Sequence, residues 1–190
     1  RKLETLQLSD IDASPANAFN NSDGGVDSNQ FTQELRLTSP AGNRLEYVLG
    51  LYYYRTENGG YAVQYGNYYG LFGAPVVVGG GRRDATNKVR SLAAFGNVTF
   101  ALTDAFKLIG GLRYTNDRNH GTLVVSPLPF PAVPLGTLPN YDGTVKADNV
   151  SGKVGVQFEP SRDFMLYATY STGFKGPAID GTAGIIREVR

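Results

Sequence analysis

Apolar and polar residues alternate with a period of two along most of this chain, and that period predicts β-strands. In residues 44–55 one set of positions is apolar or aromatic, and the other mixes charges with glycine: Leu45, Tyr47, Leu49, Leu51 and Tyr53 against Arg44, Glu46, Val48, Gly50, Tyr52 and Tyr54. The same pattern predicts strands over residues 31–38, 89–100, 106–115, 150–159 and 164–171. With a weaker candidate over residues 3–8, we expect about seven strands.

Short and long connections alternate between these strands. Tight turns are expected at residues 39–43, 102–105 and 159–163, and long loops at residues 13–28, 58–87 and 118–147. Strands joined in this order turn tightly at one end of a sheet and loosely at the other, as in outer-membrane barrels with short periplasmic turns and long extracellular loops. The expected strands have about 9–12 residues, close to the length that crosses a bilayer at a tilt. The predicted fold class is therefore all-β, with about seven antiparallel strands of a large transmembrane β-barrel.

Composition narrows the classes of function. No apolar run approaches the roughly 20 residues of a membrane-spanning helix. The chain has no cysteine, which excludes disulfides, thiolate metal sites and a cysteine nucleophile. A net charge of +1 gives no overall field for binding nucleic acid. The glycine-rich stretch at residues 79–83 lacks the strand-to-helix context of a phosphate-binding loop, so we interpret it as a loop tip.

The sequence contains no recognisable catalytic motif. His120 is the single histidine, and it lies in the expected loop at residues 118–147 beside Asn119 and Gly121. A lone histidine in a polar loop is usually solvated. No zinc-binding, nucleophile-elbow or calcium-loop pattern is present. We therefore expect no enzyme activity, no metal site and no cofactor.

Binding chemistry is concentrated in the long loop at residues 58–87. Its aromatic residues are candidates for contacts with an aromatic chelate or a sugar, because their rings stack and their hydroxyl groups form hydrogen bonds. The alternative is that they pack the loop on itself or lie at the lipid interface. These ligand-contact candidates are Tyr61, Tyr65, Tyr68, Tyr69 and Phe72.

Six sequence phrases, in this order, resemble the TonB-dependent receptors of Gram-negative outer membranes. They are FTQELRLTSP at 31–40, LEYVLGLYYY at 45–54, AAFGNVTF followed by LTD at 93–104, LIGGLRYT at 108–115, SGKV at 151–154 and LYATYSTGFKG at 166–176. Together they extend over most of the chain. The likeness rests on their order and spacing more than on any one phrase.

The resemblance implies a barrel of about 22 strands that is filled by a plug domain. Receptors of this family import scarce nutrients, most commonly a ferric siderophore or similar metal chelate, with cobalamin, haem and oligosaccharides as other cargoes. Energy comes from the TonB complex of the inner membrane. Residues 1–190 would then form one partial β-barrel domain, about a third of the barrel, without the plug domain and the remaining strands. The expected location is the bacterial outer membrane, in contact with its lipid.

Four charged residues are expected to face the lumen of such a barrel. They could attract an anionic ligand, contact the plug domain, or form ion pairs with carboxylates on neighbouring strands. These lumen-facing candidates are Glu34, Arg36, Arg113 and Lys153.

Two other hypotheses remain open from the sequence. An isolated third of a barrel has two unpaired edges, and stacking into a cross-β fibril would satisfy them through self-association. Residues 45–54 and 89–100 have the β-propensity and low charge of a fibril core. The fragment would then be an extracellular structural polymer. The last hypothesis is a soluble β-sandwich that binds a ligand, since such sheets also alternate.

Overall fold

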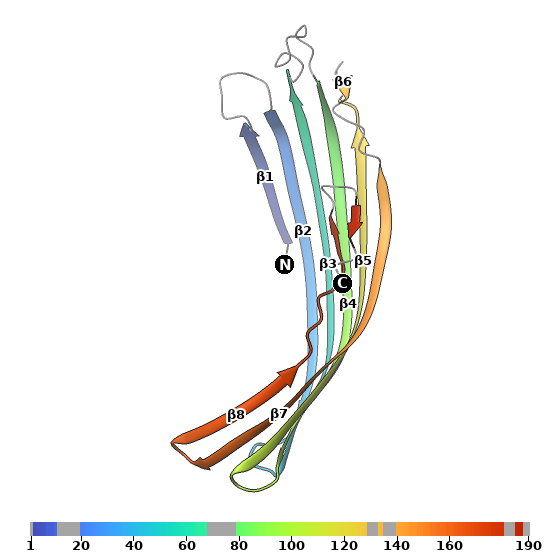
Figure 1. Ribbon diagram of the computed structural model, residues 1–190. Coiled ribbons are helices and arrows are strands. Elements are labelled where there is room, and N and C mark those ends of the chain that lie inside the picture. The colour runs from blue at the N-terminus through green and yellow to red at the C-terminus, as the bar shows by residue number, and fades with distance from the viewer. Residues whose placement is uncertain are drawn as a thin grey trace.

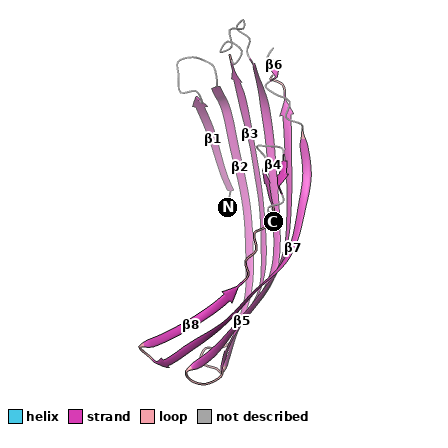
Figure 2. Cartoon of the chain, in the orientation of Figure 1, coloured by secondary structure: helices cyan, strands magenta, loops and turns pink. Residues whose placement is uncertain are grey.

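The computed structural model describes residues 2–10, 20–67, 79–128, 133–134, 140–180 and 185–187. Seven strands form one antiparallel sheet in chain order: β1 (Lys2–Asp10), β2 (Asn20–Thr38), β3 (Leu45–Gly66), β4 (Gly79–Ala101), β5 (Phe106–Ser126), β7 (Tyr141–Ser161) and β8 (Phe164–Ser171). The short β6 (Val133–Pro134) adds a parallel pair to β4. A separate two-stranded sheet is formed by β9 (Ala178–Asp180) and β10 (Ile185–Arg187). This arrangement confirms the all-β prediction with seven antiparallel strands (Figures 1 and 2).

The large sheet is long, arched and open. β2 to β5 run side by side along most of its length, and β8 diverges at the lower end in Figure 1. From the end of β8 the chain returns along the sheet, where the Asn119 side-chain amide donates a hydrogen bond to the Pro177 carbonyl at 3.3 Å. Ile179 of β9 lies so close to Gly121 that a Cβ at residue 121 would approach its Cγ2 to 2.9 Å. The β9 hairpin therefore packs against β5.

The three tight turns lie at one end of the sheet, as predicted. Residues 39–44 connect β2 to β3, residues 102–105 connect β4 to β5, and residues 162–163 connect β7 to β8. The first turn uses Gly42 with a φ of 85°, a conformation that glycine adopts without strain. In the second, the Phe106 amide donates to the Thr103 hydroxyl at 3.0 Å. The end of β3 and the starts of β4 and β7 lie at the opposite end, so the sheet has two distinct ends (Figure 1).

The expected loop boundaries were wrong, because the strands continue far beyond their amphipathic parts. β2, β3, β4, β5 and β7 contain 19, 22, 23, 21 and 21 residues. Residues 20–28, 58–66, 79–87, 118–126 and 141–147, assigned to loops above, are paired strand residues. The glycine-rich stretch at 79–83 is likewise the start of β4. Backbone pairing extends these strands through segments in which the apolar–polar alternation is lost.

The proline-rich segment contains one short bridge in its described part. Its proline content predicts that residues 127–139 form no regular strand pairing. Val133 and Pro134 align with Gly79 and Gly80 of β4. Residues 129–132 and 135–139 lie outside the described part of the chain.

The two faces of the sheet differ in chemistry. The apolar face is exposed, and it is defined by Leu35, Leu37, Leu45, Leu49, Leu51, Leu92, Val98, Phe100, Leu108, Leu112, Val150, Val154 and Leu166. Among the described residues only four hydrophobic side chains are buried, against 25 large ones that are exposed. A sheet that leaves its apolar face open has no conventional core on that side. In water this exposed area would be unfavourable, whereas in lipid it is not.

Aromatic residues lie toward both limits of the apolar face. Near the turn end, the rings of Phe106 and Phe158 are 6.4 Å apart, and at the other limit those of Phe31 and Tyr53 are 6.0 Å apart. Tyr114, one same-face register row closer to the turn end than Tyr53, donates a hydrogen bond to Asp148 at 2.9 Å. In the described ranges, no helix is long and apolar enough to span a membrane.

Candidate functional site

Charged and aromatic side chains gather on the opposite face, here called the polar face and defined by Glu34, Arg36, Tyr52, Phe95, Arg113, Ser151 and Lys153. They project from β2, β3, β4, β5 and β7, because residues of one parity on each strand share a face. In the register, Arg36, Gly50, Phe95, Arg113 and Ser151 form one continuous row across these strands. Their side chains surround an open pocket of about 530 Å³.

Arg113 is the centre of this pocket. Its guanidinium carbon lies 5.5 Å from the centre of the Tyr52 ring and 5.7 Å from that of Phe95. These distances are within the range of cation–π attraction. Its Nε also donates a hydrogen bond to the Thr115 hydroxyl at 3.1 Å. The two rings and the hydroxyl hold the guanidinium in place and leave its terminal N–H groups for another acceptor.

The pocket carries excess positive charge. Arg36 donates a hydrogen bond to Glu34 on the same strand, so these two charges compensate each other. Among the described residues, no carboxylate lies within ion-pair distance of Arg113 or Lys153. The structure therefore brings all four charged candidates, Glu34, Arg36, Arg113 and Lys153, to one pocket and leaves two cations without an acidic neighbour there.

Gly50 makes room for the aromatic part of the site. The Phe95 ring lies over Gly50, and a Cβ at residue 50 would collide with the ring. Gly50→Ala is expected to lower the free energy of unfolding by about 1–3 kcal/mol, because the added methyl group overpacks this contact. The measurement is denaturant unfolding of the full-length protein in lipid vesicles. Gly110→Ala is the matched control, since nothing lies within 4 Å of a Cβ there; equal effects of both substitutions would contradict the packing argument.

The tyrosine candidates are placed differently from the sequence expectation. Tyr61 and Tyr65 belong to β3, not to a loop, and their parity puts them on the same side as Leu51. The Tyr61 hydroxyl donates to Asp23 at 3.1 Å, and Arg82 lies 4.6 Å above the Tyr61 ring. This hydrogen bond, together with desolvation, raises the pKa of Tyr61 above its ordinary value because the neighbouring carboxylate disfavours a tyrosinate. Tyr61 of β3 thus contacts Asp23 of β2 and Arg82 of β4, on the same side of the sheet as Leu51.

The remaining candidates lie partly outside the described residues. Tyr68, Tyr69 and Phe72 fall in residues 68–78, which the structure does not describe. His120 lies on β5 instead of in a loop, with its Nδ1 3.0 Å from the Thr144 hydroxyl across the sheet. In the described ranges, no group of three or more histidine, aspartate or glutamate side chains is arranged to hold a metal ion.

Sequence reasoning missed the two aromatic partners of Arg113. Tyr52 and Phe95 interrupt the polar parity of their strands, and Phe95 made the register of residues 89–100 ambiguous. Their departure from the polar pattern was the available signal. Aromatic rings on an otherwise polar face can be stabilised by a cation, and the Arg113 guanidinium takes this place beside Tyr52 and Phe95.

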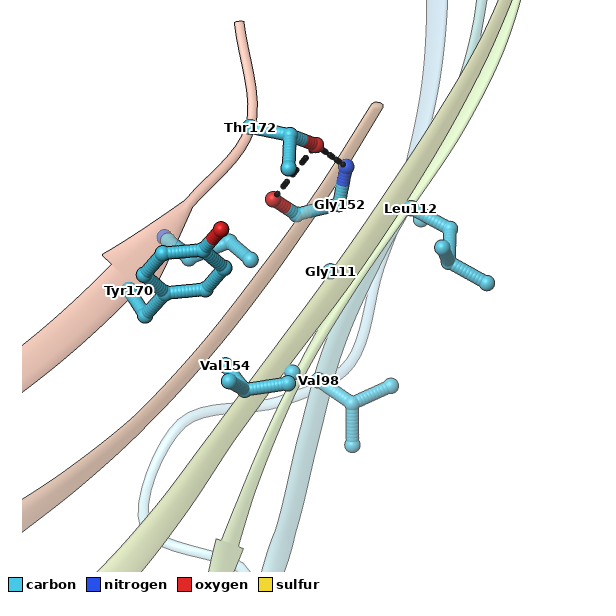
Figure 3. A pocket seen from close by; sticks show the side chains of 10 residues that line it. Val98, Gly111, Leu112, Gly152, Val154, Tyr170 and Thr172 are labelled. Carbon is cyan, nitrogen blue, oxygen red and sulfur yellow. Dashed lines mark hydrogen bonds between the residues drawn. The ribbon is translucent and has the colours of Figure 1, made fainter. Parts of the chain in front are cut away.

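A groove of about 740 Å³ lies on the other side of the sheet, where β8 diverges. Figure 3 shows Tyr170, Val154, Val98 and Leu112 around it. At its upper end the Thr172 hydroxyl accepts a hydrogen bond from the Gly152 amide at 2.9 Å. Lys153 and Thr172 also line the groove, but its exposed surface is almost entirely apolar, so the groove continues the apolar face.

Comparisons with known proteins agree on one family. The model of the family described as "TonB dependent receptor-like, beta-barrel" matches residues 4–186. The pesticin receptors of Yersinia enterocolitica and Yersinia pestis are 27% identical over 164 residues, covering 83% of this chain and 21% of theirs. The chain therefore spans about a fifth of the length of the curated relatives it matches.

Solved structures show the same fold. The ferric yersiniabactin uptake receptor FyuA from Yersinia pestis superposes with a TM-score of 0.62 at 22% identity, covering 77% of this chain and 21% of that one. The siderophore receptor PiuA from Acinetobacter baumannii gives a TM-score of 0.52 at 18% identity, covering 81% and 25%. Neither the fibril hypothesis nor the soluble sandwich hypothesis is supported by these matches.

Proposed function

Because this chain belongs to the family of TonB dependent receptor-like β-barrels, we propose that it forms part of the wall of an outer-membrane receptor that imports a ferric siderophore. The observation that carries the proposal is the two-faced sheet, with an exposed apolar face opposite a charged pocket. In a barrel, the apolar face contacts lipid and the polar face lines the lumen. The role is selective capture and passage, without a catalysed reaction.

The two ends of the sheet give the proposed receptor a direction. Short turns are periplasmic in outer-membrane barrels, so the turns at residues 39–44, 102–105 and 162–163 are assigned to the periplasmic side. The connections at residues 11–19, 67–78 and 127–140 then face the outside of the cell. Residues 1–190 are one partial barrel domain of this receptor. The other strands complete the wall, and a plug domain fills it.

The polar pocket is assigned to the passage and not to the first capture of ligand. Arg113 lies on the same register level as Leu49 and Leu51, in the middle of the apolar face. A ligand that arrives from outside reaches this level only after it has entered the barrel. There the uncompensated charges of Arg113 and Lys153 attract acidic groups of the plug domain or of an anionic chelate moving inward.

The aromatic candidates remain proposed ligand contacts at the outer end of the barrel. Tyr65, Tyr68, Tyr69 and Phe72 are at or beyond the outer end of β3, where an arriving chelate is first met. Tyr61 and Tyr65 are the weaker candidates, because their parity puts them on the same side of the sheet as Leu51. The hydroxyl group of Tyr61 also contacts Asp23, and its ring contacts Arg82.

Uptake of radioactive iron tests the proposed function. The full-length receptor is expressed in a Gram-negative strain that lacks its own siderophore receptors, and a panel of ferric siderophores is supplied under iron limitation. We expect accumulation of iron from at least one siderophore, and loss of that accumulation when the TonB complex is deleted. A receptor that is present in the outer membrane but transports none of the panel, or that transports without TonB, would contradict the proposal.

A further inference from the structure

The chain leaves the large sheet at the end of β8 through a defined contact. The Thr172 amide donates a hydrogen bond to the Gly152 carbonyl at 2.9 Å, and the Thr172 hydroxyl accepts one from the Gly152 amide at 2.9 Å (Figure 3). These two bonds end the pairing between β7 and β8. Residues 173–180, here called the strap, then run along the sheet without joining it (Figure 1).

The strap lies against the polar face of β5. Besides its contacts with Asn119 and Gly121 described above, it passes so close to Asp117 that a Cβ at Gly176 would approach Oδ2 of that aspartate to 2.5 Å. These three β5 residues have the parity of Arg113, so they face the lumen of the proposed barrel. The strap therefore covers a luminal row of β5.

Few interactions hold the strap in this position. Among the described residues, one hydrogen bond joins it to the large sheet, the 3.3 Å bond from the Asn119 amide to the Pro177 carbonyl. The backbone of β9, which is part of the strap, pairs with β10 in a separate sheet. The strap can thus leave β5 without breaking any backbone pairing of the large sheet.

Polar atoms beneath the strap are poorly satisfied. The Oδ1 atoms of Asp117 and Asn119 are buried, and within the described part of the chain no donor reaches either of them. No basic side chain of that part lies within ion-pair distance of Asp117. A buried acceptor without a donor is costly, and a buried charge without a partner is costlier. This cost opposes the packing of Ile179 against Gly121 and favours release of the strap.

The strap lies on the route from the outer end of the sheet to the charged pocket. Asp117 is four residues beyond Arg113 on β5, or about 14 Å toward the outer end. Thr172, directly before the strap, lines the pocket itself. At Gly173 nothing lies within 4 Å of a Cβ, so the chain has open space in which to turn. The strap is therefore attached beside the pocket and covers the wall above it.

We propose that the strap is a lid for the pocket around Arg113 and Lys153. It lies against β5 while the pocket is empty, and it swings about Thr172 and Gly173 over an anionic chelate that occupies the pocket. The inference rests on the proposed uptake function and adds a conformational step to it.

Lys175 gives the ligand a reason to favour the closed lid. Its side chain is exposed, and among the described residues no carboxylate lies within ion-pair distance of it. It is three residues beyond Thr172, a reach of about 10 Å, so the closed lid brings its charge to the bound anion. A ligand shifts a conformational equilibrium only through such a difference in affinity between the two states.

A disulfide between the strap and β5 tests the lid. A Cβ at residue 121 would lie 3.5 Å from the Cβ of Ile179, a separation that suits a disulfide. Residues 1–190 contain no cysteine, so oxidation of Gly121→Cys/Ile179→Cys fixes the strap on β5. The probe is the ferric siderophore of the panel above that gives the highest uptake by the full-length receptor. We expect oxidation to lower the uptake rate about tenfold or more, with a change of less than about twofold in binding to de-energised cells, and reduction to restore uptake.

The two single variants are the matched controls. Gly121→Cys and Ile179→Cys each carry one thiol and cannot form the disulfide, so oxidation is expected to leave their uptake unchanged. Equal uptake by the oxidised and the reduced double variant would overturn the proposal, and so would an equal loss in the single variants. An unmodified receptor that imports no siderophore would instead reject the proposed function, so the two failures are distinguishable.

The reactivity of the thiol in Ile179→Cys follows the strap directly. Packed against Gly121, this thiol reacts slowly with a maleimide, and it reacts faster once the strap has left β5. Saturating amounts of the same ferric siderophore are expected to raise the rate about threefold or more, whereas the thiol of Ala178→Cys, at an exposed position, keeps its rate. A rate at residue 179 that the siderophore does not change would contradict the movement, even if the double variant fails to assemble.

Discussion

Replacing Leu49 by arginine is expected to lower the free energy of unfolding of the full-length receptor in a bilayer by about 2–4 kcal/mol. Leu49 lies in the middle of the apolar face, and its side chain is 46% exposed even though it is a large hydrophobic residue. Its register neighbours on that face are Leu37 and Gly96. A guanidinium at this depth has no acidic or aqueous partner, so the cost is that of placing a charge in hydrocarbon.

The neighbouring position provides a matched control. Val48 is on the same strand and at the same depth, but it faces the polar side between Thr38 and Asn97. Val48→Arg introduces the same side chain into the lumen, two residues from Glu46, and is expected to cost about 1 kcal/mol or less. Reversible unfolding by denaturant in lipid vesicles measures both variants. If Val48→Arg were as costly as Leu49→Arg, the assignment of the two faces would be wrong.

Reversing the charge of Arg113 is expected to reduce the maximal rate of siderophore uptake about tenfold, with a change of less than about twofold in the dissociation constant for binding at the cell surface. Two unit charges about 7 Å apart, one on Arg113 and one on the passing ligand, interact by about 2–3 kcal/mol at an effective dielectric constant near 20. Screening by salt reduces this energy but leaves enough for about a tenfold effect on the rate. Arg113→Glu also replaces the cation over Tyr52 and Phe95 with a carboxylate, which the ring faces repel.

Comparing the change in uptake rate with the change in surface affinity shows whether the pocket acts in ligand passage or in ligand capture. Uptake of radioactive iron gives the rate, and binding to de-energised cells gives the affinity. Arg162→Glu, a reversal in the turn between β7 and β8, is the control and is expected to change neither. A loss of surface affinity as large as the loss of rate would place Arg113 in the capture site. No change in either quantity would remove the pocket from the transport path.

The parts of this fold that cross the lipid could be predicted from the sequence, and the parts beyond the lipid could not. Leu49 and Leu112 lie on the face that their period-two pattern predicts, because lipid on one side and lumen on the other impose opposite chemistry on successive residues. Around Asn58 and Asn87 the sheet lies beyond the proposed lipid level, so neither face has to be apolar. The two residues pair in the same β3–β4 ladder, but the alternation that identifies a strand disappears.

The candidate site divides in a similar way. Glu34, Arg36, Arg113 and Lys153 were identified from charge and parity alone, and the structure brings them around one pocket. The contacts of Arg113 with Tyr52 and Phe95 depend on the pairing of three strands, which no local pattern specifies. The Tyr61–Asp23 hydrogen bond likewise joins residues 38 positions apart. Long-range partners of this kind become visible only when the register is known.

The strands are long enough for ligand recognition to occur farther from the membrane than ligand passage through it. β3 has 22 residues, and at about 3.4 Å per residue and a tilt near 40° it rises about 55–60 Å, of which the hydrocarbon band accounts for about 25 Å. A hydrogen-bonded wall therefore extends about 30 Å beyond the hydrocarbon band, through the headgroup layer and outward. A molecule that enters this barrel is enclosed by a rigid vestibule well before it reaches bilayer depth. Recognition can be completed in that vestibule while the permeability barrier below stays closed.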